Sequence, residues 1–490
     1  MRERHSRPAP WRGLAACALA FCSAMQQARA DPFETERAVP RVAAGSLIGS
    51  EADCRFGPVG EPLQLKEAIE RALCNNNQTR QAWIGIKVQA AAVGESRGAF
   101  LPKVSAEIDA THDEALGRVQ GHPELSSSDT SGFESGNVSL SWVLFDFGGR
   151  DAALRNATSL LAAAQAGHDG VLQTVFATTA QDYYAAQAAT GVLAAAVDAE
   201  KASRGSYEAA SARVDKGVAP VTDALQAQTA LAQATYNRAK AAGDLQVALG
   251  VLAADMNLRA DTTLALPDPY DGVQPNAEFD RSVSELMNDA ARTHPEVRQA
   301  QAQLDAAVAK VDSVRAQGLP SVSLVVGSSR NNRPVSPSLG QPLYPATGRD
   351  MSFGIQVSVP LFSGFSTLYQ VKQAQAQVEL QQVALDDSRR QVELGVWTAY
   401  QHLQTATQNL DNSIKLLEAA HASREATQAR YVSGVGSIIE QLAAESALVA
   451  AVSQRLQALT DWRSSRLQLA GKLGALGMWR IAAADARRDR

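Results

Sequence analysis

The chain has 490 residues, of which 45% are hydrophobic and 20% are charged, and its formal net charge is -5 at pH 7. Its length and its 4 cysteines exclude a small disulfide-rich scaffold, and its hydrophobic content excludes a disordered protein. After the first thirty residues no run of about 18 apolar residues occurs, which excludes a bundle of membrane-spanning helices. A membrane β-barrel remains compatible with this composition, because its strands are short and only half apolar.

Residues 1–30 have the three parts of a secretory signal peptide. Several arginines precede an apolar run from Leu14 to Met25, and Ala28-Arg29-Ala30 forms an A-x-A cleavage site. We therefore expect an exported chain that begins at Asp31, with an N-terminal extension over residues 31–62. Its two cysteines, Cys54 and Cys74, form either one disulfide or two free thiols in an oxidising compartment.

An internal repeat has a period of 217 to 218 residues. Arg80–Ser105 shares 10 of 26 residues with Arg298–Ser323, and Gly205–Leu231 shares 11 of 27 with Ala422–Leu448. We interpret this as two tandem structural repeats, because chance similarity between alanine-rich helices would not keep one offset over such a length. The predicted repeats are residues 63–264 and 283–478, with a linker at 265–282 and a short tail at 479–490.

Proline is scarce in two long segments, which predicts uninterrupted helices because proline costs about 3 kcal/mol inside a helix. The longest helices are expected over Asp151–Lys216 and Ser366–Ser433, and at 1.5 Å per residue the first spans roughly 100 Å. Shorter helices are expected before and after each long one, over Leu65–Gly98, Val221–Asn257, Val283–Gly318 and Ile438–Leu476.

Tight turns follow the two long helices at equivalent positions. Gly217 and Gly434 fit the position after a helix that needs a left-handed backbone. Pro220 fits the first turn of the next helix, and Gly436 belongs to the second turn. Each long helix is therefore expected to reverse direction into a returning helix.

Four segments alternate apolar and polar residues with a period of two, which is typical of strands with one apolar face. We expect strands at about 101–113, 137–147, 319–327 and 350–362, with long polar loops over Glu114–Gly136 and Gly327–Asp350. Such segments fit either a soluble hairpin or a membrane barrel. Four strands cannot close a barrel, so a barrel would need several copies: two give eight strands and three give twelve.

These features together resemble the TolC family of outer-membrane channel proteins. The resemblance rests on L-P-x-V-S before each hairpin, L-F-D-F-G-G at Leu144–Gly149 and R-Y-V-S-G-V-G at Arg430–Gly436, and it extends from about Leu63 to Leu476. It implies a mainly α-helical chain that forms a homotrimer, with a twelve-stranded β-barrel in outer-membrane lipid above a twelve-helix periplasmic barrel. The linker at 265–282 would belong to a belt around the helices.

The resemblance also implies a passive exit duct that works with a periplasmic adaptor and an inner-membrane ABC transporter. Within the family, the chain looks most like the members that serve type I secretion of protein toxins. This likeness rests on the missing lipid-anchor cysteine, which many drug-efflux members have. The outer-membrane component of a multidrug efflux pump is the alternative, and a soluble periplasmic adaptor or coiled-coil protein is an alternative of a different class. No motif for catalysis, a metal or a cofactor occurs, and no basic patch indicates nucleic acid.

The candidate gate residues lie beside the two turns. Asp223 and Glu440 occupy equivalent first turns, where acidic side chains cap helices; Ser437 and Glu440 also fit an S-x-x-E capping box. By resemblance, Glu440 belongs to a ring of carboxylates that attracts cations, and Asp223 and Tyr431 form bonds that hold the tip shut. The sequence departs from this pattern because Gly436 and Ala443 replace a gate arginine and a second ring carboxylate.

Overall fold

The structure is a computed structural model that describes residues 31–45, 54–123, 126–270, 283–333, 335, 344 and 346–474. The predicted signal peptide, the linker residues 271–282 and the tail at 479–490 lie outside the described residues, as do residues 46–53 of the N-terminal extension. The chain divides into two compact units, which are treated separately below. Of the described residues, the first unit takes those within 31–39, 87–158 and 312–370, and the second takes those within 40–86, 159–311 and 371–474.

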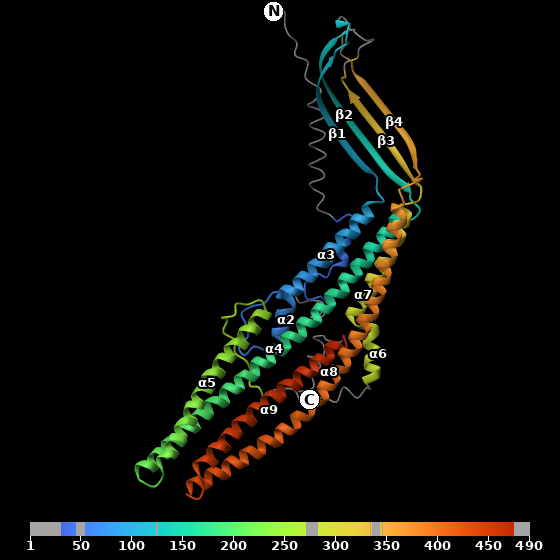
Figure 1. Ribbon diagram of the computed structural model, residues 1–490. Helices are drawn as coiled ribbons and strands as arrows, with labels where there is room; N and C mark the ends of the chain where they lie inside the picture. The colour runs from blue at the N-terminus through green and yellow to red at the C-terminus, as the bar shows by residue number, and fades with distance from the viewer. Residues whose placement is uncertain are drawn as a thin grey trace, which may run out of the picture. The chain divides into compact units, whose positions relative to one another are not determined.

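Helices of matching length recur in the two halves of the sequence (Figure 1). Helices α2 and α6 have 11 residues each, α3 and α7 have 22, α4 and α8 have 67, and α5 and α9 have 35. None of the described helices has a stretch both long and apolar enough to cross a bilayer. Their bounds are Leu65–Asn75 (α2), Asn77–Gly98 (α3), Gly149–Asp215 (α4), Val221–Asp255 (α5), Val283–Thr293 (α6), Pro295–Ala316 (α7), Ser366–Val432 (α8) and Ile438–Lys472 (α9), after a short 3-10 helix η1 at Thr35–Ala38.

The two leading helices are each interrupted, whereas the sequence predicted one continuous helix in each half. The first breaks at Asn76, whose side-chain Oδ1 accepts a hydrogen bond from the Gln78 N–H at 2.9 Å and so starts α3. The second breaks at His294, because Pro295 disfavours a helical backbone in the residue before it. The prediction of one continuous helix over 65–98 and another over 283–318 is therefore wrong, because each segment is divided into two helices.

A four-stranded antiparallel sheet in the first unit has the order β1-β2-β3-β4 (Figure 1). Its strands are Lys103–Gly117, Ser127–Phe145, Ser321–Asn331 and Gly348–Ser358, in that order. The central pair joins the two halves of the sequence, with Leu140 opposite Val326 and Trp142 opposite Leu324. No further strand covers the outer edges of β1 and β4 within the described residues.

One face of this sheet is apolar and exposed in the single chain. Because side chains alternate along a strand, the register places Val104, Leu140, Val326 and Phe353 on the same face. Phe353 is 77% exposed. The opposite face has small and polar residues such as Ser105 and Ser139, whose hydroxyl oxygens lie 2.8 Å apart.

Strand ends differ from those expected for two physical reasons. Strands β1 and β2 continue through much of the predicted loop 114–136, because backbone pairing such as Glu114 with Thr130 does not need apolar side chains. Strand β4 ends at Ser358 rather than near 362, because Pro360 has no N–H to donate to a ladder.

In the second unit, small residues dominate the helix contacts. One cluster packs Ile69 and Leu73 of α2 against Leu172 and Phe176 of α4, and another joins α6 and α7 to Leu385 and Val396 of α8. Many of the other buried positions are alanines, so helix axes can approach closely. Helices α4 and α5 form one hairpin and α8 and α9 form the other (Figure 1).

Candidate functional site

The turns at the ends of the two hairpins have the same capping geometry. Gly217 and Gly434 adopt φ values of 71° and 78°, as predicted for a left-handed residue after a helix. The N–H of Val218 donates to the Arg213 carbonyl at 2.9 Å, and the N–H of Val435 donates to the Arg430 carbonyl at 3.1 Å. Both bonds are the long-range bond of a Schellman motif, so the two helices end in the same way.

The returning helices start differently. Pro220 is the N-cap residue of α5 rather than its first helical residue, and it has no capping side chain. At α9, the Oγ of Ser437 accepts a hydrogen bond from the N–H of Glu440 at 3.2 Å, which forms the predicted cap. The carboxylate of Glu440 lies beside Arg430 of α8 instead, with 3.6 Å between Oε2 and Nη1.

Gly436 occupies a position where a side chain would collide with the end of α8. A Cβ atom there would lie 3.0 Å from the Cβ of Arg430 and 3.0 Å from the backbone nitrogen of Tyr431. The N–H of Gly436 donates to the Arg430 carbonyl at 3.0 Å. The glycine that replaces the expected gate arginine therefore permits close backbone packing.

Tyr431 is buried where the two hairpins meet, and is 6% exposed. It packs with Ala210 of α4, Ala227 of α5 and Ile438 of α9. Its hydroxyl is buried without a hydrogen-bond partner among the described residues. Asp223 was also expected to bond between helices, but no hydrogen bond or ion pair of its side chain occurs in the described chain.

Arg213 of α4 is a tip residue that was not singled out from the sequence. Its Nη1 donates to the Tyr431 carbonyl at 3.2 Å, and its Cζ atom lies 4.8 Å from the centre of the Tyr431 ring. The repeat gave a usable signal, because Arg213 is the equivalent of Arg430 under the offset of 217. Nearby, Gln441 of α9 donates from Nε2 to the Oγ of Ser206 of α4 at 3.2 Å, and Arg424 pairs with Glu445 at 3.0 Å.

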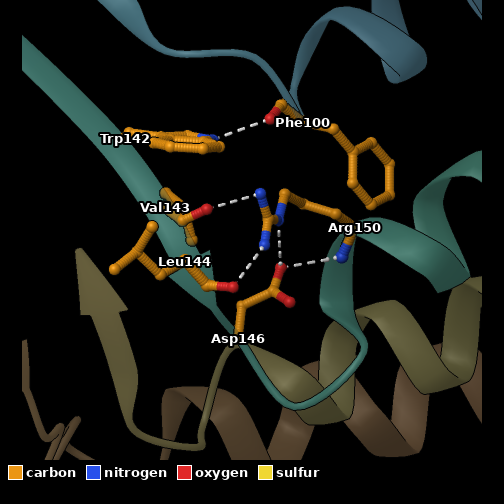
Figure 2. A network of polar contacts seen from close by, with 6 residues as sticks. All are labelled: Phe100, Trp142, Val143, Leu144, Asp146 and Arg150. Carbon is orange, nitrogen blue, oxygen red and sulfur yellow. Dashed lines mark hydrogen bonds and ion pairs between the residues drawn. The ribbon is translucent and has the colours of Figure 1, made fainter. Parts of the chain in front are cut away.

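In the first unit, a polar network fastens the turn between β2 and α4 (Figure 2). Arg150 donates from Nη1 to the Val143 carbonyl at 2.7 Å, and its Nε lies 3.2 Å from Asp146 Oδ2. The guanidinium also covers the Phe100 ring at 4.9 Å, while the Trp142 indole donates to the Phe100 carbonyl at 2.8 Å. The motif at Leu144–Gly149 is therefore a strand-to-helix turn.

The N-terminal extension is attached to α2 by a disulfide. Cys54 and Cys74 are bonded in the structure, with 5.5 Å between their Cα atoms. Beside them, the Arg71 Nη2 donates to the carbonyls of Gly57 and Pro58, each at 2.8 Å. Of the two alternatives for these cysteines, the structure therefore has the disulfide.

Two groups near the middle of the second unit have shifted pKa values. Burial, together with the hydrogen bond and charge of Asp182, raises the pKa of Asp255 to about 7. Burial lowers the pKa of His294 against an opposing effect of Glu296. Neither lies at the hairpin turns. No cluster of three or more metal-ligating side chains occurs in the described part of the chain.

Comparison with known proteins places these features in a family. The sequence profile of the outer membrane efflux protein family matches residues 68–257 and 286–475. Protein CyaE of Bordetella pertussis is 33% identical over 420 residues, which cover 85% of this chain and 85% of CyaE. The probable efflux pump outer membrane protein TtgC of Pseudomonas putida is 25% identical over 425 residues, which cover 81% of each chain.

Solved structures agree on the fold. The crystal structure of the outer membrane protein VceC from Vibrio cholerae aligns with a TM-score of 0.70 at 18% identity, covering 84% of this chain and 96% of that one. Identity at this level supports the fold alone. The resemblance to the TolC family is confirmed by the family profile and by the identity to CyaE. The chain therefore belongs to the outer membrane efflux protein family, and its location is the outer membrane and the periplasm.

Proposed function

We propose that this chain is the passive outer-membrane exit duct of a type I secretion system and that its cargo is a protein. The observation that supports a duct is the four-stranded sheet. It has one exposed apolar face and two edges without a neighbouring strand among the described residues. A backbone edge in lipid costs several kcal/mol for each unsatisfied group, so copies of the chain must pair β4 with β1.

Three copies give a twelve-stranded barrel wide enough for a water-filled lumen, and the family resemblance favours three over two. Twelve long and stacked helices would continue the duct through the periplasm. The equal lengths of the paired helices and the two matches to the family profile, each 190 residues long, support two tandem structural repeats per chain. The duct has no catalytic role in this proposal, and it docks to a periplasmic adaptor and an inner-membrane ABC transporter.

Protein cargo is favoured over drugs because the sequence resembles the family members that serve type I secretion, and its identity to the efflux pump protein TtgC is lower than that to CyaE. Deleting the gene distinguishes the two. Loss of one secreted protein from the medium, with unchanged drug resistance, supports type I secretion. Hypersensitivity to drugs with unchanged secretion would support the efflux alternative.

The tip of the duct is proposed as a cation-attracting ring that contains Glu440. Threefold symmetry brings three copies of this carboxylate together and raises the local field. In planar bilayers, Glu440→Gln is expected to lower cation selectivity and block by divalent cations. Asp244→Asn is the matched control, because Asp244 is an exposed acid of α5 paired with Lys240 at 2.8 Å. Unchanged selectivity in Glu440→Gln would leave Glu440 as a helix-capping residue alone.

A further inference from the structure

Helices α4 and α7 contact each other directly in the second unit. The Nη1 of Arg298 on α7 lies 3.6 Å from the Oδ2 of Asp169 on α4. Close by, a Cβ atom added at Gly167 of α4 would lie 3.2 Å from the side-chain amide group of Gln299 of α7. We call this contact of α4 with α7, around Asp169 and Arg298, the inner joint.

The repeat places both members of this ion pair a second time in the chain. Helices α3 and α7 have 22 residues each, and α4 and α8 have 67 each, so the two pairs of helices are equivalent. The offset of 218 puts Arg80 of α3 at the position of Arg298. The offset of 217 puts Asp386 of α8 at the position of Asp169. An arginine and an aspartate therefore recur on the two helices that do not form the inner joint.

The recurring residues do not pair with each other within one chain. Arg80 is exposed, and its side chain has no hydrogen bond or ion pair in the described chain. Asp386 has an ion pair only with Arg389 among the described residues, one turn along its own helix at 3.4 Å. One chain thus contains both sides of a second joint, and neither side contacts the other.

Apolar side chains accompany both charges on the same helix faces. Ile84 lies one turn after Arg80, on the same face of α3, and is 50% exposed. Val383 lies one turn before Asp386, on the same face of α8, and is 62% exposed. The equivalent positions in the inner joint hold two buried alanines, Ala302 and Ala166. The faces that are covered in the inner joint are therefore uncovered, and larger, on α3 and α8.

The difference in side-chain size has a physical reason. The inner joint forms between parts of one chain, so small side chains suffice and let the helix axes approach closely. Separate copies lose translational and rotational freedom when they associate, and burial of larger apolar side chains offsets this cost. Isoleucine and valine at these positions therefore suit a joint between copies.

We propose that Arg80 and Ile84 of α3 bind Asp386 and Val383 of α8 in a second copy of this chain, in an outer joint that repeats the ion pair of the inner joint. The two sides of this joint are different surfaces, so the contact is head to tail, and when such contacts close they form a ring. The inference rests on the proposed duct, which needs a ring. The order is the same as in the proposed pairing of β4 with β1, because α3 leads to β1 and β4 leads to α8.

Cysteine crosslinking between copies tests the outer joint. Gln81 and Ala384 are the equivalents of Gln299 and Gly167, which approach closely in the inner joint. The full-length protein with Gln81→Cys, Ala384→Cys and its native disulfide is oxidised in detergent with copper phenanthroline. Denaturing gels without reductant are expected to show a ladder of linked copies that ends at three. A single band at the mass of one copy overturns the outer joint.

The single-cysteine variants distinguish a head-to-tail contact from a twofold one. Gln81→Cys alone and Ala384→Cys alone are each expected to stay unlinked, and their coexpression is expected to give linked pairs. Crosslinking of Gln81→Cys with itself would show that like faces meet and would contradict the outer joint. Gly167→Cys combined with Gln299→Cys is the matched control, because its link lies within one chain and adds no band of higher mass.

Exchange of the charges tests the ion pair. Arg80→Asp and Asp386→Arg are each expected to speed dissociation of the oligomer in SDS, by up to about fivefold for each contact, which is the range of an exposed ion pair. The double variant is expected to recover a slower rate, because the opposite charges face each other again. Dissociation of the double variant as fast as that of the faster single variant contradicts the ion pair.

Ile84→Asp tests the apolar part of the outer joint. It is expected to abolish assembly, because the joint would bury an unpaired carboxylate. Val308→Asp is the matched control, because Val308 is 48% exposed on α7, the equivalent helix. Circular dichroism checks that both variants fold, and light scattering after gel filtration measures their mass. Equal assembly of the two folded variants would overturn the apolar contact, and the charge exchange decides the joint if Ile84→Asp does not fold.

Conductance in planar bilayers separates the outer joint from the proposed duct. A crosslinked ladder from wild-type-like protein that conducts no ions would support the joint and refute the duct. A conducting protein without the ladder would refute the joint and leave the duct. A ladder that ends at a number other than three would support the joint and refute the trimer.

Discussion

The two hairpin tips share a backbone and differ in their side-chain bonds. Both long helices end in the same left-handed glycine and the same capping bond. In the α8–α9 turn the serine cap and the pair of Arg430 with Glu440 are both local. In the α4–α5 turn there is no capping side chain, and Arg213 bonds outside its own hairpin. Repetition of the sequence thus conserves the turn, while the neighbouring helices decide where its charges bind.

Other equivalent positions in the two halves also differ in their side-chain bonds. Helix α2 is joined to the preceding chain by the disulfide, whereas α6 has Arg292 at the position of Cys74. Arg150 fastens the first strand-to-helix turn, whereas in the described chain Thr367 at the equivalent position contacts Ser363 alone, through its hydroxyl at 3.0 Å and its N–H at 3.4 Å. The first half therefore carries more specific ties at these places than the second.

The largest expected effect is removal of the disulfide. Replacing Cys54 and Cys74 by serine is expected to lower the stability of the α2 region by about 2–4 kcal/mol, because the unfolded segment gains freedom. Hydrogen exchange with mass spectrometry should show faster exchange in α2. Helix α6 is the internal control, and equal protection of α2 in both proteins would show that the disulfide contributes no local stability.

Removal of the hydrogen bonds and ion pair of Arg150 is expected to have the next largest effect on stability. Arg150→Ala removes charge-assisted hydrogen bonds of about 1.5–3 kcal/mol each before relaxation. Trp142 shares the Phe100 region of this network, so tryptophan fluorescence during denaturation measures the loss. Thr367→Ala in the other half should cost less than about 1.5 kcal/mol. Equal losses of stability in the two variants would show that the two strand-to-helix turns are held equally strongly.

Gly436 and its equivalent Ala219 test the turns themselves. Gly436→Ala places a Cβ atom 3.0 Å from the Tyr431 nitrogen and is expected to destabilise the chain by about 1–3 kcal/mol, because the added methyl group crowds the end of α8. Ala219→Gly in the other turn should cost about 0.5–1 kcal/mol through backbone entropy. Thermal unfolding followed by circular dichroism compares the two. A smaller cost for Gly436→Ala than for Ala219→Gly would show that the close approach is not limiting.

The smallest effects concern pH, and they have opposite signs in the two halves. The folded pKa of Asp255, about 7, is raised above its ordinary value, so its contribution to stability is present below about pH 4 and is lost as the pH rises to about 7. The pKa of His294 is lowered, so its contribution is present above about pH 6.5 and is lost as the pH falls through the folded value.

Asp255→Asn should therefore raise stability at neutral pH, and His294→Asn should raise it at acidic pH. The second change introduces the residue found at the equivalent position, Asn76. Melting temperatures between pH 4 and 8 measure both effects, which solvent screening keeps small. The difference in melting temperature between each variant and the wild type should change with pH in opposite directions for the two variants. A change in the same direction would contradict the pKa shifts of Asp255 and His294.

Much of the fold could be predicted from periodicity and proline placement. The long helices α4 and α8 differ from their predicted ranges by at most two residues at each end, because their helical pattern is uninterrupted. The four strands were found at the right places, but β1 and β2 extend into a polar segment without alternation. Backbone pairing continued there without a pattern in the side chains. The breaks at Asn76 and His294 depend on one capping side chain and one proline, which periodicity alone does not detect.

The candidate site was predicted in part. The turn glycines and the cap of Glu440 by Ser437 follow from local rules and were found as expected. Bonds between helices were expected for Asp223 and Tyr431 by resemblance, and in the single chain Tyr431 is bonded by Arg213. That contact joins residues 218 positions apart, so no local rule could find it.

By itself the sequence determined the helical hairpins, their turns and the four apolar-faced strands, because each depends on residues close together in the chain. Only the tertiary structure decided which of two equivalent arginines stays within its hairpin and which crosses to the other. The physical reason is that a guanidinium binds the acceptors that the packing of neighbouring helices brings within its reach. At Arg213 the packing of α4 beside the end of α8 places the Tyr431 ring and carbonyl there.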